Sequence, residues 1–265
     1  MDSRLLDMRD CRTGAFAAIH RDMLALALSQ QPRWFRPLLR KSRTLQGWTG
    51  YDHWSRAWEY PWAVLAAGLG VRPLCTLDVG GGGSPFALYL AARGHESHVA
   101  DPSLDQGSSF VFDRQKSLYK NARSVVKRLL FRATGIHTLW GLPDRNGRAL
   151  VIYHAQPADR LEFPDRRFDR VFCLSVFEHI PRGLWGGCLR EFQRVLAPGG
   201  RLIITLDMTP EEANHRIYFD LVENCDLALL GDPRYDVPIG PESKHARHPG
   251  HGYETLGLVW EKRDR

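Results

Sequence analysis

The sequence predicts an α/β fold in which helices flank a mostly parallel sheet, preceded by a helical segment at the N-terminus. From residue 74 to residue 208, short apolar runs alternate with amphipathic stretches, as parallel strands joined by helices do. The run 74–79 passes directly into four glycines, which is typical of a buried strand that enters a tight turn. The 265 residues are 43% hydrophobic and 25% charged, and this composition excludes a disordered chain or a coiled-coil rod.

The net charge of +6 is unevenly distributed along the chain. Residues 1–150 hold 21 Lys and Arg against 12 Asp and Glu, whereas residues 151–265 hold 15 against 18. A basic half attracts an anionic substrate, a nucleic acid or an acidic membrane face, and it is equally typical of a solvated surface. The longest early apolar stretch, 23–28, is far shorter than the roughly 18 residues that a membrane span needs, so we expect no membrane-spanning helix.

The cysteines and histidines predict a reducing compartment and no bound metal. Five cysteines stand alone without a C-x-x-C pair, which argues against a disulfide framework and against a thiolate zinc site. The N-terminus mixes acids and bases without a signal-peptide core, so we expect a cytoplasmic protein. His245, His248 and His251 have a spacing that can ligate zinc, but no Cys or carboxylate partner accompanies them, and we expect a non-metal loop there.

The first 72 residues are predicted to be mostly helical. Trp54, Trp58 and Trp62 follow a spacing of four, which places them on one helix face if the helix continues through Pro61. This face is either part of a lid over a ligand or a stripe that packs on the core. Arg56 beside it is either a carboxylate ligand or an ordinary surface arginine.

Residues 74–101 predict one strand–turn–helix–strand unit. The strand 74–79 is followed by glycines 80–83, and a helix is expected over 86–93. Ser84 suits the N-cap of this helix, Pro85 its first position and Gly94 its C-terminal stop. A second strand then leads to Asp101.

Two later regions complete the predicted order of elements. We expect a helical insertion at 102–148, in which the helix 112–132 carries one apolar and one basic face. The basic face meets a phosphate, a carboxylate-rich glycan or an RNA backbone, or it is simply solvated. The remaining strands are expected at 149–153, 168–175, 201–207 and 255–261, with helices at 184–196 and 211–229.

The glycine turn is a poor cradle for phosphates. A dinucleotide site needs G-x-G-x-x-G, and Pro85 stands where the third glycine belongs. The G-K-[ST] of a phosphate loop is absent from the sequence. A nucleoside ligand without phosphates is the alternative, because a turn without side chains lets a ligand lie against the main chain.

The pattern of acidic residues and glycines resembles that of the class I S-adenosylmethionine-dependent methyltransferases. Asp78, Gly80 and Gly82, with Asp101 closing the next strand, follow the first motif of this family, although Ser84 replaces its third glycine. Residues 161–181 resemble its fourth-strand signature, and residues 189–202 its helix–Pro-Gly-Gly–strand signature, closest to the type 11 subgroup. The three blocks occur in the family order over residues 74–208.

The resemblance implies a Rossmann-like sheet of seven strands, with the last strand antiparallel, and S-adenosyl-L-methionine as the cofactor. It implies that Asp101 accepts hydrogen bonds from both ribose hydroxyls. Gly80, Gly81 and Gly82 would let the methionine part of the cofactor approach the main chain, and Asp78 would lie near its amino group. Ser175 would contribute backbone contacts beside the methionyl part.

Two further assignments stay open at this point. The family often places an acidic residue before the fourth strand to receive the adenine amino group, but Pro157 stands at the best-aligned position. Asp159 or Gln156 is expected to take its place, and Asp159 is otherwise a solvated loop carboxylate. His179 is the candidate general base, and its alternative role is in packing or loop geometry.

The function predicted from these residues is methyl transfer from S-adenosylmethionine to an oxygen or nitrogen atom of a small molecule. RNA or tRNA methylation is the less favoured alternative, suggested by the basic half. A non-catalytic relative that binds only a cofactor or a partner is another alternative, and a dehydrogenase is a third. We divide the chain into a helical lid segment, 1–72, and a methyltransferase domain, 73–265.

Overall fold

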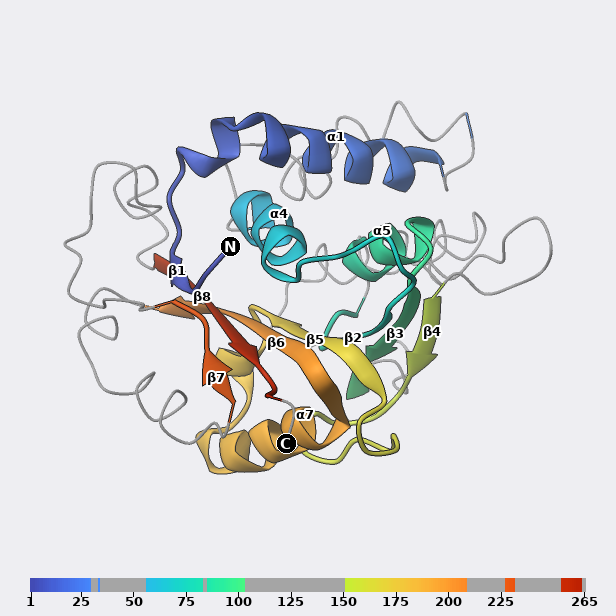
Figure 1. The fold of residues 1–265 in the computed structure, drawn as a ribbon, viewed down its shortest axis with the longest axis vertical. Helices are drawn as coiled ribbons and strands as arrows, with labels where there is room; N and C mark the ends of the chain where they lie inside the picture. The colour runs from blue at the N-terminus through green and yellow to red at the C-terminus, as the bar shows by residue number, and fades with distance from the viewer. Residues whose placement is uncertain are drawn as a thin grey trace, which may run out of the picture.

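The computed structural model describes residues 1–29, 33, 56–82, 85–102, 151–208, 227–231 and 254–263. Helices α1, α4 and α5 lie over one face of a single sheet, and α7 packs against the other face (Figure 1). The helices are α1 (Gly14–Ser29), α4 (Arg56–Ala66), α5 (Phe86–Ala92) and α7 (Trp185–Val195), with 3-10 helices η1 (Asp10–Arg12), η4 (Phe177–His179) and η5 (Arg182–Leu184). The strands are β1 (Arg4–Leu5), β2 (Cys75–Val79), β3 (Glu96–Ala100), β4 (Val151–His154), β5 (Phe168–Leu174), β6 (Leu196–Met208), β7 (Ala228–Leu229) and β8 (Glu254–Glu261).

The strands follow the order β1-β8-β6-β5-β2-β3-β4, with β7 also paired to β8. Strands β4, β3, β2, β5 and β6 are parallel to their neighbours, whereas β8 is antiparallel to β6. These pairings confirm the predicted mostly parallel sheet with an antiparallel last strand. The two-residue strand β1, which pairs with β8 through Arg4 and Leu5, is not predicted by the sequence.

Each face of the sheet has its own hydrophobic core, because the central strands send alternate side chains to opposite faces. From β5, Val171 and Cys173 join the core beneath α7, while Phe172 and Leu174 join the core beneath α4 and α5. A sheet covered on both faces in this way needs near-continuous apolar strands, as the sequence predicts.

The unit β2–turn–α5–β3 follows the prediction closely, with one correction. Gly94 has a φ of +89° just after the end of α5, which confirms its predicted role as the helix stop. Pro85 occupies the N-cap position and not the first helical position, and Phe86 begins the helix. The predicted N-cap, Ser84, lies outside the described residues.

The aromatic face of α4 is a core face. Trp58 and Trp62 are fully buried and stack with their ring centroids 5.1 Å apart. Trp62 packs so closely on β8 that a Cβ on Gly257 would come within 2.6 Å of its ring. The lid interpretation is therefore wrong for these two tryptophans, and Trp54 lies outside the described residues.

Helix α4 continues through Pro61 because side chains outside the helix bind the one carbonyl that proline leaves without a helical hydrogen bond. Proline has no N–H for the carbonyl four residues earlier, that of Ala57. The Nε2 atom of His20 in α1 hydrogen-bonds this carbonyl, and the Cys11 thiol donates to it at 3.7 Å. Burial lowers the pKa of His20, which keeps the ring neutral in this contact.

Several predicted elements lie outside the described residues. They include the insertion at 102–148 from residue 103 onward, residues 211–226 of the expected helix 211–229 and the loop with His245, His248 and His251. The predicted end of that helix is wrong, because Ala228–Leu229 form strand β7, which pairs with β8. The division of the chain at residue 72 stays a prediction. Among the described helices, none has the length and apolar character that a membrane crossing requires.

The contact between His20 and Ala57 can be tested by a double-mutant cycle. We expect His20→Phe to lower the free energy of unfolding by about 1–3 kcal/mol, because a buried carbonyl loses its main donor. Pro61→Ala supplies a main-chain N–H to the same carbonyl, so His20→Phe should cost clearly less in that background. Urea denaturation of the four proteins measures both costs, and equal costs would contradict this account of α4.

Candidate functional site

The candidate site lies at the edge where the parallel strands β2, β3, β4 and β5 end. Ligands of open α/β sheets bind beyond the carboxyl ends of such strands. Gly80 follows β2, Asp101 follows β3 and Ser175 follows β5 (Figure 1). The structure therefore brings the residues with predicted cofactor roles to one edge of the sheet.

The turn after β2 requires glycine at each of its described positions. Gly80 and Gly82 have φ values of +74° and +45°, which favour glycine. A Cβ on Gly80 would stand 2.4 Å from the Cγ1 atom of Val176, and a Cβ on Gly81 only 2.2 Å from Oδ2 of Asp78. The turn thus folds back over the buried carboxylate of Asp78 and packs against the segment that follows β5.

Asp101 faces this turn from the end of β3. Its main-chain N–H donates to the carbonyl of His154 at 3.0 Å, and the N–H of Gly80 donates to Ala100 at 2.7 Å. A Cβ on Gly82 would lie 3.0 Å from Oδ2 of Asp101. A half-buried carboxylate therefore stands opposite main chain that carries no side chains, and this arrangement fits the ribose of a nucleoside against an open backbone.

Ser175 is held by a network that the sequence does not predict. Its φ of +46° is unusual for a residue other than glycine, and its N–H donates to both the carbonyl and the hydroxyl of Thr205 at 3.0 Å. Its hydroxyl donates to Glu59 of α4, a fully buried carboxylate that also accepts from Thr205 at 2.5 Å. The N–H of Ser175 is already hydrogen-bonded to Thr205. The predicted backbone contact to a cofactor would therefore have to use the carbonyl of Ser175.

Arg56 also belongs to this network. Its guanidinium pairs with Glu59 at 3.2 Å and donates to the carbonyl of Leu174 at 2.8 Å. Burial alone would lower the pKa of Arg56, but the surrounding negative charges, with Glu59 the largest and Asp207 and Glu178 adding to it, together outweigh burial and raise that pKa. The arginine that the sequence left as either a ligand or a surface residue thus has a partner within the protein.

Glu178 and His179, adjacent on η4, face in different directions. Oε1 of Glu178 accepts from the N–H of Asp207 at 3.1 Å, and Oε2 is buried without a hydrogen-bond partner among the described residues. Burial raises the pKa of Glu178 to about 8, and the negative charges of Asp207 and Glu59 add to this effect. His179, the predicted base, is exposed.

Comparison with known proteins identifies the domain. Residues 77–204 match the family described as "Methyltransferase domain". The chain carries a methyltransferase domain. The match confirms the resemblance to the class I methyltransferases, whose cofactor is S-adenosylmethionine. No curated protein matches the chain.

Solved structures with a similar fold have low identity to the methyltransferase domain. The 1,6-didemethyltoxoflavin N1-methyltransferase of Burkholderia thailandensis, with its substrate and S-adenosylhomocysteine bound, is 19% identical over 88% of this chain and 91% of its own, with a TM-score of 0.47. The YcgJ protein of Bacillus subtilis is 16% identical over 78% and 99%, with a TM-score of 0.46. Phosphoethanolamine N-methyltransferase 2 of Haemonchus contortus, with phosphomonomethylethanolamine and S-adenosylhomocysteine bound, is 16% identical over 77% and 52%, with a TM-score of 0.47.

The two residues considered for adenine differ in their surroundings in the methyltransferase domain. Gln156, just after β4, is buried; its Oε1 accepts from the N–H of Glu162 at 2.9 Å, and its Nε2 has no hydrogen-bond partner among the described residues. Asp159 packs near α7, since a Cβ on Gly187 would lie 3.4 Å from the Asp159 Cβ. Gln156 therefore offers a buried donor that Asp159 does not.

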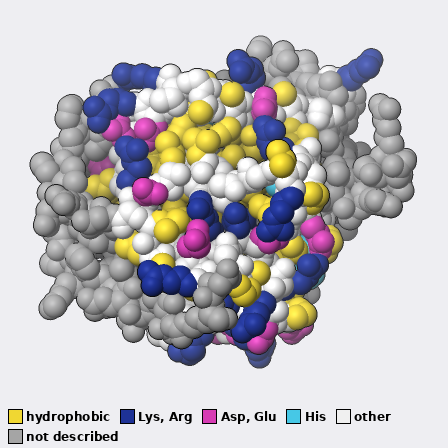
Figure 2. Space-filling model, viewed as in Figure 1, with side chains coloured by type: hydrophobic (Ala, Val, Ile, Leu, Met, Phe, Trp, Pro, Cys, Tyr) yellow, Lys and Arg dark blue, Asp and Glu magenta, His cyan; other side chains and the backbone are white. Residues whose placement is uncertain are grey.

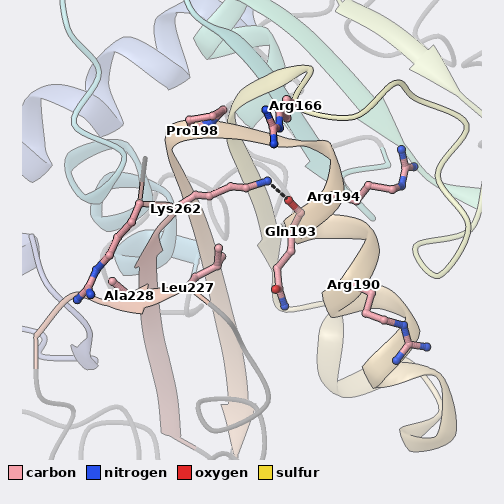
Figure 3. Close-up of a pocket in the computed structure, with 9 residues that line it drawn as sticks. Arg166, Arg190, Gln193, Arg194, Pro198, Leu227, Ala228 and Lys262 are labelled. Atoms are coloured by element: carbon pink, nitrogen blue, oxygen red, sulfur yellow. Dashed lines mark hydrogen bonds between the residues drawn. The ribbon is translucent and has the colours of Figure 1, made fainter. Parts of the chain in front are cut away.

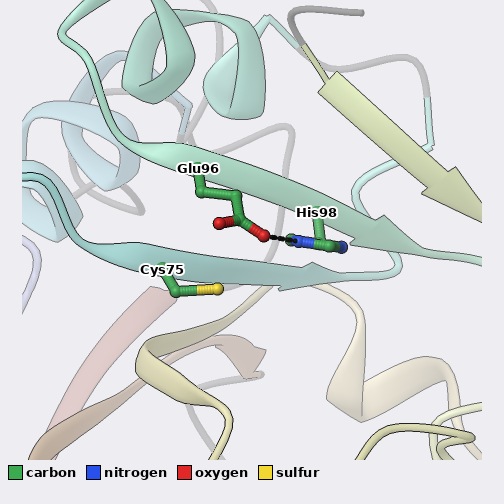
Figure 4. Close-up of side chains that lie close together, drawn as sticks. All are labelled: Cys75, Glu96 and His98. Atoms are coloured by element: carbon green, nitrogen blue, oxygen red, sulfur yellow. Dashed lines mark hydrogen bonds and ion pairs between the residues drawn. The ribbon is translucent and has the colours of Figure 1, made fainter.

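A second polar cluster lies at the opposite edge of the sheet of the methyltransferase domain. The Cys75 thiol, a Glu96 oxygen and a His98 nitrogen lie within 4.8 Å of one another, close enough to hold a metal ion (Figure 4). However, Oε1 of Glu96 already accepts from His98 at 2.8 Å and from the guanidinium of Arg167. Burial raises the pKa of Cys75 to about 11, so the thiol is protonated at neutral pH. Hydrogen bonds and an ion pair account for this cluster.

The buried carboxyl of Glu178 makes the stability of the methyltransferase domain pH-dependent. The pKa of Glu178 rises from 4.5 to about 8 on folding. Between these two pH values the folded state keeps a proton that the unfolded state has lost. The free energy of unfolding therefore falls as the pH rises from 4.5 to about 8. Glu178→Gln removes this loss, so between pH 5 and pH 8 the variant should gain about 1–3 kcal/mol relative to wild type.

Urea denaturation at both pH values measures this gain. Glu162→Gln, which removes an exposed carboxylate just beyond Leu161, is the control. A constant difference between Glu178→Gln and wild type across this pH range would show that Glu178 is ionised in the folded state.

Proposed function

We propose that the methyltransferase domain transfers the methyl group of S-adenosylmethionine to an oxygen or nitrogen atom of a small molecule. The observation that carries the proposal is the glycine turn, whose bare main chain faces the carboxylate of Asp101. When bound, the cofactor supplies an electrophilic methyl group on a sulfonium that leaves as a neutral thioether.

The described residues are assigned to the cofactor as follows. Asp101 accepts hydrogen bonds from both ribose hydroxyls, and the main chain of Gly80, Gly81 and Gly82 receives the methionine part. Asp78 acts from beneath the turn, because its Oδ2 lies against Gly81 and the side chain is 3% exposed. We therefore assign Asp78 to shaping the turn as well as to the amino group of the cofactor.

Gln156 is our assignment for the adenine contact. A buried amide nitrogen without a partner is costly, and an adenine ring nitrogen would satisfy it. The N–H groups of Gln156 and Asp101 both donate to the carbonyl of His154 at the end of β4, which supports an adenine contact next to the ribose role proposed for Asp101.

The residues after β5 are assigned to the methyl acceptor. In-line transfer depends mainly on the alignment of the nucleophile with the methyl group and sulfur. Val176 packs on Gly80 of the cofactor turn, and His179 follows on η4 with its side chain exposed. His179 takes a proton from a hydroxyl or ammonium acceptor, while Glu178 faces inward and anchors the segment to β6.

The charge pattern on one described face supports a small substrate over RNA. An RNA-binding surface presents basic residues gathered into a patch or stripe. On the face shown in Figure 2, the described Lys and Arg side chains alternate with acidic and hydrophobic ones.

Asp101→Asn tests the cofactor assignment. The substitution removes the charge that two ribose hydroxyls would meet, so we expect S-adenosylhomocysteine to bind about tenfold more weakly or worse. Calorimetric titration measures this affinity. Asp22→Asn, on the exposed surface of α1, is the matched control and should bind like wild type. Equal affinity for wild type and Asp101→Asn would refute the ribose role.

Gly80→Ala tests the turn itself. A methyl group there meets the side chain of Val176 and must adopt a φ of +74°, so we expect S-adenosylhomocysteine binding to be lost. Val176→Ala in the same chain removes the contacts to the two γ-methyl groups, but it leaves a Cβ at 3.0 Å and the backbone strain, so binding should return in part. If Gly80→Ala binds as wild type does, the ligand does not depend on this turn.

A further inference from the structure

A basic cavity of about 520 Å³ lies at the edge of the sheet opposite the candidate site. It is bounded by the segment before β5, the C-terminal half of α7, the turn within β6 and the residues after β8 (Figure 3). Because the seven residues of β5 separate the two edges, this cavity lies about 20 Å from Ser175. Its cationic residues are Arg166, Arg190, Arg194, Lys262 and Arg263.

The acidic residues near the cavity neutralise only part of this charge. Glu191 and Asp165 both pair with Arg194, at 2.8 and 2.7 Å. Arg166, Arg190 and Arg263 have no acidic partner within the part of the chain that the structure describes. Three guanidinium groups of the lining are therefore without a counter-charge among the described residues.

Lys262 adds a fourth positive charge inside the cavity. Its ammonium donates to the carbonyls of Gln193 and Leu196 at 2.6 and 2.7 Å, at the C-terminal end of α7. An ammonium has three donors, so one remains for a ligand. Burial and the positive charge of Arg166 lower the pKa of Lys262, and a bound anion would offset the repulsion from Arg166.

Main-chain hydrogen bonds fix the positions of two cationic residues. Arg166 has a φ of +57°, a strained conformation for arginine, and its N–H donates to the carbonyl of Arg194 at 2.9 Å. Lys262 is bonded through its N–H and its carbonyl to Gly200 and Gly199, at 2.9 and 2.8 Å. The backbone that presents these charges is therefore set before any ligand arrives.

We propose that this cavity binds a small, multiply charged oxyanion, such as a compound with a diphosphate or several carboxylate groups. Guanidinium groups pair with phosphate and carboxylate oxygens in two-point contacts, and Leu227 and Ala228 offer an apolar wall to the rest of the molecule. The volume of about 520 Å³ lies in the range of small-molecule pockets. The site is distinct from the proposed cofactor site and goes beyond the methyl-transfer function.

Calorimetric titration of the full chain with pyrophosphate and with citrate tests the proposal. We expect at least one of them to bind in a saturable way at 50 mM salt and about tenfold more weakly in Arg190→Gln and in Arg166→Gln. Arg21→Gln removes the same charge from the exposed surface of α1 and should bind like wild type. The relative strength of the two ligands tells a phosphate site from a carboxylate site.

Several outcomes would overturn the proposal. Binding of neither anion by wild type would do so, as would equal weakening in Arg190→Gln, Arg166→Gln and Arg21→Gln. A single-stranded RNA that binds through Arg190 and Arg166 when neither small anion does would assign the surface to nucleic acid instead. S-adenosylhomocysteine affinity and thermal unfolding, measured on the same variants, should stay at wild-type values, and a change in either would show that the substitutions act through the fold.

Discussion

The buried carboxylate of Glu59 connects the N-terminal helix α4 to the functional edge of the sheet. A carboxylate without exposure is tolerated only where donors surround it, and here Ser175, Thr205 and Arg56 supply them. These bonds hold Ser175 in its left-handed conformation, which presents Val176 to Gly80. The shape of the glycine turn therefore depends on a residue of the segment that precedes the first parallel strand.

The two hydrophobic cores explain why polar side chains that can contact a ligand lie at the edges of the sheet. Each central strand gives alternate side chains to opposite cores, so the middle of the sheet has no room for polar groups that lack partners. Asp78 is a buried carboxylate near the end of β2, where Gly81 of the glycine turn covers it. Polar side chains that act on ligands must therefore lie where strands begin or end.

The sequence predicts this methyltransferase fold where the signal is local. The strand, glycine turn and helix from 75 to 92 follow from adjacent residues, and so does the position of Asp101 after the next strand. It does not predict β1, because a pairing of two residues with a strand about 250 positions away leaves no pattern in either segment. Nor does it distinguish Glu178 from His179, since both side chains are polar and only the packing of η4 on β6 turns one inward.

Ordinary structural roles account for only some of the positive charges around the basic cavity. Lys262 caps carbonyls at the C-terminal end of α7, where a cation is favourable, and Arg194 is balanced by two carboxylates. Neither reason applies to Arg166 or Arg190, which surround the same cavity without a counter-charge among the described residues. The positive charge of Arg166 already lowers the pKa of Lys262, and an anion bound between these residues would offset that repulsion.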